Sequence, residues 1–230
     1  MTKSEGYTMT KKNFKRRLPI LLMALVFAAT SAMATDITGV SGNNGVFNID
    51  PIGAVNHGGQ SIGYRTYDNF NLTQGDTANL KFDSGISSFV NMVNNRIDIN
   101  GVLNTTKNGN YHDGNAIFVS PNGMVVGSQG ILNVGSLSVY TPTAPGMHML
   151  KKGFESGTLT TTYQGKQIDL MEAIGWHGNA PIEINGQIYS HGDVNMVANQ
   201  FKLGSTGNIA AGANEISADL FDALVNTNKS

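Results

Sequence analysis

The pattern of apolar and polar positions is most regular between residues 114 and 140, where short apolar runs alternate with turns rich in Asn and Gly. The runs cover residues 116–119, 124–126, 131–132 and 137–140. None has a helical period, and each ends near a residue type that tolerates positive φ. Strands of about three to five residues with no helix between them cannot form ordinary βαβ crossovers. The pattern therefore predicts an all-β solenoid, in which each coil stacks its strands on the coil before it.

Turn glycines recur at similar intervals in the predicted solenoid. The interval from Gly101 to Gly123 is close to the interval from Gly186 to Gly207. Similar sequences, IDINGVL and IEINGQI, surround Gly101 and Gly186. A period of about 20 residues is typical of a solenoid built from one strand-and-turn unit.

The region before the regular coils predicts a covered end of the solenoid. Residues 35–61 contain short apolar pieces between Gly/Asn turns, and we interpret them as irregular strands over the N-terminal end of the core. Such a cover is needed because an open end exposes unpaired strand edges. Residues 64–82 alternate apolar and polar positions around a turn at 74–76, which predicts a hairpin with one buried face.

Two further segments interrupt or follow the coils. Residues 141–181 are expected to form an insertion, with an extra-helical hairpin strand at 158–163 and a short helix at 168–174. Trp176, the single tryptophan, is interpreted as a cover over an apolar patch rather than a platform for a sugar. Residues 214–230 predict an amphipathic helix and the start of a remainder that a truncated reading frame leaves out.

Residues 1–34 are predicted to be a signal peptide. A basic n-region precedes an apolar stretch at 18–29, and an A-x-A cleavage signal ends at Ala34, before Thr35. The start is open between Met1 and Met9. Removing the segment leaves 15 − 6 = 9 basic and 16 − 1 = 15 acidic residues, a net charge of about −6 with His neutral. The basic footprint of a nucleic-acid-binding protein is therefore absent.

The chain contains no cysteine, which excludes a disulfide scaffold. Two loop sequences, His112-Asp113 and His191-Gly192-Asp193, could supply metal ligands, with His177 as a third. Their spacing fits no zinc signature, and His or Asp in such loops is common turn chemistry. We therefore expect neither a metal nor a cofactor.

The turn asparagines are the first candidates for a structural role. At equivalent positions of successive coils, Asn side-chain amides can stack into a hydrogen-bonded ladder, and Asn also accepts left-handed backbone angles. The candidates are Asn95, Asn100, Asn122, Asn133 and Asn185. Contact with a ligand is the alternative role for these side chains.

An enzyme built on a β-helix is the alternative function. Polysaccharide-active enzymes of this shape need clustered carboxylates at separations set by the mechanism. Asp98, Glu183, Asp193 and Lys202 are scattered along the sequence beside turns, and no nucleophile-elbow or phosphate-loop motif occurs. The chain is therefore expected not to be an enzyme, with a secreted polysaccharide-active β-helix enzyme as the alternative.

One segment resembles a known family. Residues 114–127, GNAIFVSPNGMVVG, resemble the G-x-x-F-L-I-N-P-N-G-I-x-x-G signature of the two-partner-secretion domain, the N-terminal domain of filamentous haemagglutinin-like adhesins. Residues 136–140 resemble the strand that follows it, and residues 67–82 are similar to the family's early strand pair. The resemblance covers most of residues 36–213 and is nearest to leukotoxin-type filamentous adhesins. Ser120 replaces the family's first Asn, and the second N-P-N-L element is missing.

The resemblance implies a fold and a function. Residues 35–213 would form a right-handed, single-stranded parallel β-helix with an N-terminal cap, and Ser120, Pro121, Asn122 and Gly123 would form its secretion motif. The domain would pass through the periplasm and be recognised by the POTRA domains of an outer-membrane β-barrel transporter. It would then fold at the cell surface and serve adhesion to a host glycan or protein. A purely structural surface fibre segment is a third possibility.

Overall fold

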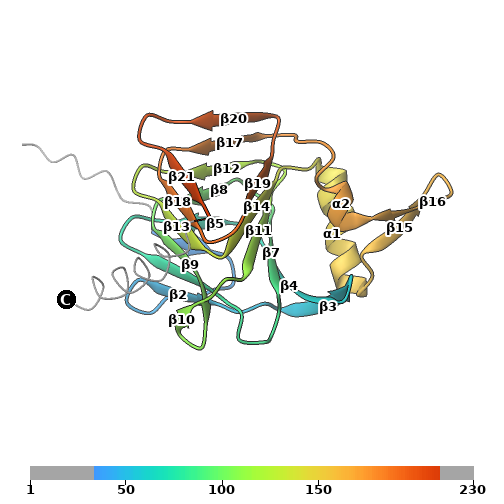
Figure 1. Cartoon of the computed structure of the whole chain (residues 1–230), viewed down its shortest axis with the longest axis horizontal. Helices are drawn as coiled ribbons and strands as arrows, with labels where there is room; N and C mark the ends of the chain where they lie inside the picture. Colours follow the sequence, from blue (N-terminus) through green and yellow to red (C-terminus); the bar gives the residue numbers. More distant parts are fainter. Residues whose placement is uncertain (1–33, 213–230) are drawn as a thin grey trace, which may run out of the picture. The chain divides into compact units, whose positions relative to one another are not determined.

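The computed structural model describes residues 34–212, which form short β-strands and two helices (Figure 1). Most strands lie in three sheets, here named A, B and C. Sheet A contains, in spatial order, β1 (Asp36–Ile37), β5 (Phe70–Leu72), β8 (Ile97–Ile99), β12 (Met124–Val126), β17 (Pro181–Ile184) and β20 (Gln200–Leu203). Sheet B contains β2 (Val46–Ile49), β6 (Thr77–Lys81), β9 (Val102–Lys107), β13 (Ile131–Val134), β18 (Gln187–Ser190) and β21 (Asn208–Ala211), with β10 (Asn110–Tyr111) paired to β9. Sheet C contains β19 (Val194–Val197), β14 (Ser136–Tyr140), β11 (Asn115–Val119), β7 (Ser88–Val93), β4 (Gln60–Tyr67) and β3 (Gly53–His57).

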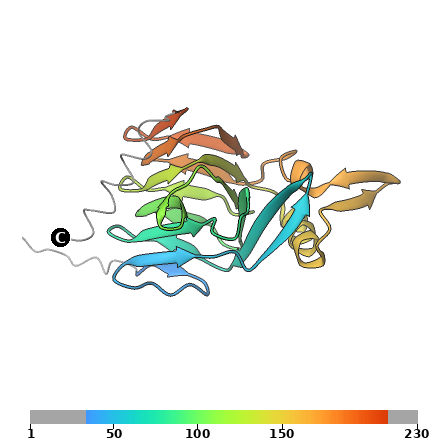
Figure 2. The ribbon, with the colours of Figure 1, turned by 60° about the horizontal axis from the view of Figure 1, so that its bottom comes forward.

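From β5 onward the chain passes through sheets A, B and C in the same rotation. Successive passes are β5-β6-β7, β8-β9-β11, β12-β13-β14, β17-β18-β19 and β20-β21. Strands from neighbouring passes pair in parallel in all three sheets. Figure 2 shows these coils stacked one on another. The described residues are therefore mainly β-structure with mostly parallel sheets, which is compatible with the predicted parallel β-helix.

Two predicted elements lie outside the part of the chain that the structure describes. The signal peptide falls on residues 1–33 apart from its last residue, Ala34, and the C-terminal helix falls on residues 214–230. Both stay predictions from the sequence.

Columns of apolar side chains fill the space between the sheets. In sheet A, successive coils place Phe70, Ile97, Met124 and Ile182 in register, and all four are at most 1% exposed. Their strand neighbours are more exposed, because side chains alternate across a strand. Burial of one column member from each coil therefore fixes the register of the whole stack.

A column of glycines lies at the corner between sheets A and B. Gly101, Gly130, Gly186 and Gly207 precede four strands of sheet B that stack on one another. A Cβ on any of them would lie within 2.4 Å of a backbone oxygen of the preceding coil. Glycine is required here because the backbones of two coils approach each other at this point.

The predicted near-constant period of about 20 residues does not hold through the stack. In sheet B, Thr77 pairs with Val102, Val102 pairs with Ile131, and Gln187 pairs with Asn208. The sequence interval grows from the first of these pairs to the second and is shortest in the third. Gly101 and Gly123 were predicted to be equivalent positions of the repeat, which is wrong. Gly101 precedes β9 at the corner between sheets A and B, whereas Gly123 precedes β12 at the corner between sheets C and A. Coil length varies because the corners differ in length while the strands keep their register.

The hairpin predicted at residues 64–82 is also wrong. Its two halves form β5 in sheet A and β6 in sheet B, so residues 73–76 turn a corner between sheets. The antiparallel hairpin lies earlier and joins β3 to β4 through Gly58 and Gly59, both with positive φ. In addition, β1 pairs antiparallel with β5 along the edge of sheet A.

The segment between β14 and β17 contains α1 (Ala144–Ser156), β15 (Thr160–Tyr163), β16 (Lys166–Asp169) and α2 (Leu170–Ala173). Strands β15 and β16 form the extra-helical hairpin. The helix predicted at 168–174 is shorter, because residues up to Asp169 belong to β16 and Asp169 caps α2. The sequence reasoning missed α1, which begins at the N-cap Thr143 and ends at the left-handed Gly157.

The insertion packs against the outer face of sheet C. Met147, Leu150 and Phe154 of α1 form one buried cluster with sheet residues that include Val90 and Ile117. The central strands β7 and β11 are therefore buried on both faces, which explains their nearly continuous apolar sequences. Within residues 34–212, no helix is long and apolar enough to cross a membrane.

A ladder of asparagines runs through sheet B. Asn48, Asn79, Asn104 and Asn133 lie in register in successive coils. The Nδ2 of Asn79 donates to Oδ1 of Asn48 at 3.1 Å, Asn104 donates to Asn79 at 3.1 Å, and Asn133 donates to Asn104 at 3.5 Å. Asn104 and Asn133 are fully buried, whereas Asn48 is exposed at the end of the ladder.

Replacing Asn104 with Ala should destabilise the fold. The change removes both ladder hydrogen bonds of this buried residue, which costs about 1–3 kcal/mol of unfolding free energy. The same change at the exposed Asn48 should cost less than about 0.5 kcal/mol. Equilibrium denaturation of both variants tests this, and equal losses would contradict a stabilising role of the buried ladder.

Candidate functional site

The predicted secretion motif, residues 120–123, forms the corner between β11 and β12, where the chain passes from sheet C to sheet A. Ser120 is 1% exposed. Its Oγ donates to the backbone oxygen of Asn95 at 2.8 Å and accepts from the backbone N–H of Asn122 at 3.1 Å. The side chain therefore closes its own turn and links it to the preceding coil.

Asn122 and Gly123 extend these links in both directions. The Nδ2 of Asn122 donates to the backbone oxygen of Asn94 at 2.8 Å. Gly123 has φ +84, and a Cβ at this residue would lie 2.2 Å from the backbone oxygen of Pro181 in the following coil. Glycine is therefore required both by the left-handed backbone and by the close approach of the next coil.

The insertion lies beside this corner. Asn179 donates from Nδ2 to the backbone oxygen of Pro121 at 3.1 Å, and Lys151 of α1 donates from Nζ to Oδ1 of Asn94. Burial lowers the pKa of the Lys151 ammonium below its usual range. A cavity of about 270 Å³ separates α1 from the corner and is lined by Asn94, Pro121, Asn122, Ala144, Met147, His148 and Lys151.

The motif has a buried part and an exposed part. Ser120 and Gly123 are buried, Pro121 is half-buried, and Asn122 is exposed. A partner of the folded domain could therefore contact Asn122 and Pro121, whereas Ser120 and Gly123 act through the geometry of the turn. Ser120 also occupies the position at which the resembled family has Asn, and its hydroxyl makes one bond to a backbone N–H and one to a backbone carbonyl.

The other predicted asparagines occupy two corners. Asn95 donates from Nδ2 to Oδ1 of Asn69 at 2.7 Å, at the same corner as the motif. Asn100 and Asn185 share a column at the corner between sheets A and B, but Gly127 separates them in register. A Cβ at Gly127 would lie 2.2 Å from Oδ1 of Asn100. The amides of Asn100 and Asn185 therefore make no contact with each other. Asn95 bonds to one Asn of the preceding coil, and Asn133 belongs to the longer ladder of sheet B.

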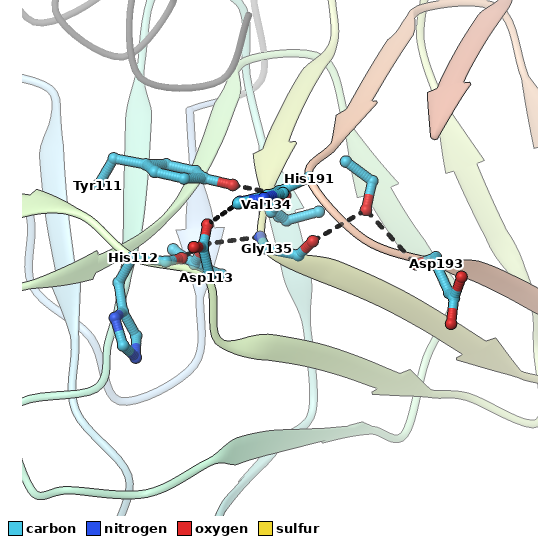
Figure 3. Close-up of polar contacts among 9 residues, drawn as sticks. Tyr111, His112, Asp113, Val134, Gly135, His191 and Asp193 are labelled. Carbon is cyan, nitrogen blue, oxygen red and sulfur yellow. Dashed lines mark hydrogen bonds and ion pairs between the residues drawn. The ribbon is translucent and has the colours of Figure 1, made fainter. Parts of the chain in front are cut away.

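Four of the candidate metal ligands lie at the corner between sheets B and C, where two of them pair (Figure 3). The remaining candidate, His177, lies in the insertion between α2 and β17. Nδ1 of His191 lies 2.5 Å from Oδ1 of Asp113. Figure 3 shows the His112 ring and the Asp193 carboxylate pointing away from this pair. Burial and nearby Lys107 lower the pKa of His112. In the described part of the chain, no group of three His, Cys, Asp or Glu side chains could hold a metal ion.

Hydrogen bonds between coils surround the His191–Asp113 pair in Figure 3. The Tyr111 hydroxyl donates to the backbone oxygen of Val134 at 3.0 Å. Ser190 donates from Oγ to the backbone oxygen of Gly135 at 3.1 Å, and the N–H of Gly135 donates to Oγ1 of Thr105 at 3.1 Å. These bonds join successive coils, so the arrangement is that of a structural corner.

The polar residues considered for catalysis are less scattered than the sequence suggested. Asp98, Val125, Glu183 and Lys202 form one column across sheet A. Asp98 and Glu183 are separated by two strand spacings, about 9–10 Å. Asp98 pairs with Arg96 at 2.8 Å, and Glu183 accepts a hydrogen bond from Asn185 at 2.9 Å. Asp193 lies elsewhere, immediately before β19.

Sequence reasoning missed the residues that hold the motif from outside its own turn. Asn94, Lys151 and Asn179 contact the corner from segments that are distant in sequence. No local pattern marks them, because the contacts depend on where the insertion folds. The chain matches no protein-family model, and no curated protein matches its sequence.

Replacing Gly123 with Ala should destabilise the fold more than the same change at Gly75. Both glycines have similar left-handed angles, φ +84 and φ +90, but a Cβ at Gly75 would meet nothing within 4 Å. Gly75→Ala should therefore cost only backbone strain, about 1–2 kcal/mol. Gly123→Ala adds a clash with a backbone oxygen, for a total of about 2–5 kcal/mol. Chemical denaturation measures both, and equal losses would show that the close approach at Gly123 is unimportant.

Proposed function

We propose that residues 35–213 are the secretion domain of an exported adhesin, and that a POTRA-bearing outer-membrane transporter recognises this domain. The domain passes through the periplasm after cleavage between Ala34 and Thr35, and folds at the cell surface, where it serves adhesion to a host glycan or protein. It acts as a binding and transport module rather than as an enzyme. The cleavage site is proposed from the sequence, because residues 1–33 lie outside the described part of the chain.

One observation carries this proposal: the turn at residues 120–123 links three successive coils. It bonds to Asn94 and Asn95 in the coil before, and Ser120 donates from its N–H to the backbone oxygen of Tyr140 in the coil after. The sequence that resembles a secretion signature thus coincides with the corner that ties the stack together. A strained turn there would hinder coil stacking, the step that we propose accompanies export.

The finer description of the fold belongs to the same proposal. We assign the coils to a right-handed, single-stranded parallel β-helix, since crossovers between parallel strands are right-handed in about 98% of cases. We assign β1 and the β3–β4 hairpin to the N-terminal cap. Their antiparallel pairing at the sheet edges supports this role, because a cap must occupy strand edges that would otherwise pair with another chain.

Substitutions in the motif should reduce secretion. We would express the full chain in a Gram-negative host with and without the POTRA-bearing transporter of its own genome, and measure the fraction in the medium. Asn122→Ala removes the hydrogen bond to Asn94, and Gly123→Val clashes with Pro181 in the next coil. Each should lower the transporter-dependent fraction at least about threefold, the effect of roughly 1 kcal/mol on a folding-coupled step.

Two matched variants control for general effects on expression. Asn110→Ala changes an exposed Asn at the start of β10, whose side chain donates only to the backbone oxygen of Asn108 in the described structure. Gly75→Val carries similar left-handed backbone strain, but its Cβ meets nothing within 4 Å, so it should lower secretion less than Gly123→Val does. Secretion that does not need the transporter, or that survives both motif variants, contradicts the proposal.

A reporter fused after residue 213 separates transport from a purely structural role. With the domain present, the reporter should reach the medium when the transporter is expressed. With residues 36–213 deleted, it should remain in the periplasm. Unchanged release of the deleted fusion would favour the structural fibre segment.

A further inference from the structure

We propose that the insertion carries a binding site for a small, uncharged hydrophobic molecule, a function separate from secretion. The site is a pocket of about 310 Å³ formed by the start of α1, the β15–β16 hairpin and α2. Its walls include Pro145, Met149, Tyr163, Ile168, Ala173 and Trp176. Three segments that are separate in sequence therefore converge on one apolar pocket outside the coils.

Large apolar side chains are exposed around this pocket. Tyr163 is 62% exposed, Trp176 58% and Met149 49%. Only three other large hydrophobic residues in the described chain are as open, and two of them, Phe201 and Leu203, lie on β20. Single exposed apolar residues need no explanation, but three around one pocket mark a binding site. Trp176, interpreted from the sequence as a cover over an apolar patch, thus forms part of an apolar wall and leaves much of its own ring open to solvent.

The floor of the pocket is fixed by the core of the insertion. Leu170 and Ile174 line the pocket and also belong to the buried cluster that joins α1 to sheet C. The carboxylate of Asp169 caps α2 at Met171 and lies 2.7 Å from Nε2 of His57 in β3. The helix that carries the floor is thus anchored both to the coils and to the β3–β4 hairpin. A pocket held in this way is largely preformed, as most small-molecule sites are.

The lining indicates the chemistry of the ligand. Among the described residues that line the pocket there is no Asp, Glu, Lys, Arg, Asn or Gln. A carboxylate or phosphate ligand would find no fixed countercharge in this lining. A sugar would find none of the planar amide or carboxylate side chains that bind adjacent hydroxyls. The lining residues with polar side-chain groups are three Thr residues, Tyr163, Trp176 and His177. This set fits a ligand of one to three rings with at most one or two hydrogen-bonding groups. The pocket is at the small end of the usual range of roughly 300–1,000 Å³.

The single tryptophan makes the test specific. Trp176 is the only tryptophan in the chain and lies in the pocket wall. We would titrate the full chain with N-phenyl-1-naphthylamine, a neutral two-part aromatic probe, and record energy transfer from Trp176. Saturable transfer with one site per chain is expected. Energy transfer that rises linearly with probe concentration and does not saturate would overturn the proposal. The proposal would also fail if the probe did not bind and neutral methyl glycosides instead quenched Trp176 fluorescence saturably.

Two variants place the probe in the pocket. Gly146 lines the pocket, so the side chain in Gly146→Leu should occupy it and abolish saturable binding. The variant should still fold, because a Cβ at Gly146 would make only ordinary contacts at 3.5 Å. Met149→Ala should weaken binding about three- to tenfold through lost apolar contact. Phe201→Ala is the matched control, since Phe201 and Met149 are both 49% exposed.

Circular dichroism and the melting temperature verify that each variant folds. Binding that is unchanged by Gly146→Leu and Met149→Ala in folded protein overturns the proposal, as does a comparable loss in Phe201→Ala. None of these outcomes depends on the transporter, so secretion and pocket binding can fail independently.

Discussion

The close parallel stacking of backbones from successive coils is the constraint on which the rest of the structure depends. Neighbouring strands lie about 4.8 Å apart, so a corner that touches the next coil has little space for a side chain. Gly101 and Gly123 meet this limit at two different corners, where a Cβ would lie 2.4 Å and 2.2 Å from a backbone oxygen of the adjacent coil. The apolar columns between the sheets then fix the register, because a one-residue slip would turn each column outward.

This constraint explains which features could be predicted from sequence. Individual strands were recognisable, since period-2 alternation and Asn/Gly turns are local properties. The sheet that each strand joins was not, and residues 64–82 show why: alternation around a short turn looks the same in a hairpin and at a corner between sheets. Helix α1 was missed because Pro145, Gly146 and Gly153 weaken the local helical pattern, whereas its buried face is stabilised by sheet C.

The candidate site could also be predicted only in its local part. The turn at 120–123 follows from its own sequence, as Ser, Asn and Gly each have a local reason to be there. Its supports do not, because Lys151 and Asn179 reach the corner only through the fold of the insertion. The same holds for the column that joins Asp98 to Glu183, whose members are far apart in sequence and only two strands apart in sheet A.

The corner between sheets C and A shows how register and variation coexist. The connection between the flanking strands is short after Tyr67, Val93, Val119 and Val197, whereas after Tyr140 it contains the whole insertion. All five connections leave the inner columns in register, because the added residues lie outside the sheets. The entropic cost of closing a loop grows slowly with its length, so this corner can accommodate even the long insertion. The buried residues of this corner are therefore fixed by stacking, while its outer residues can acquire a pocket without disturbing the coils that hold them.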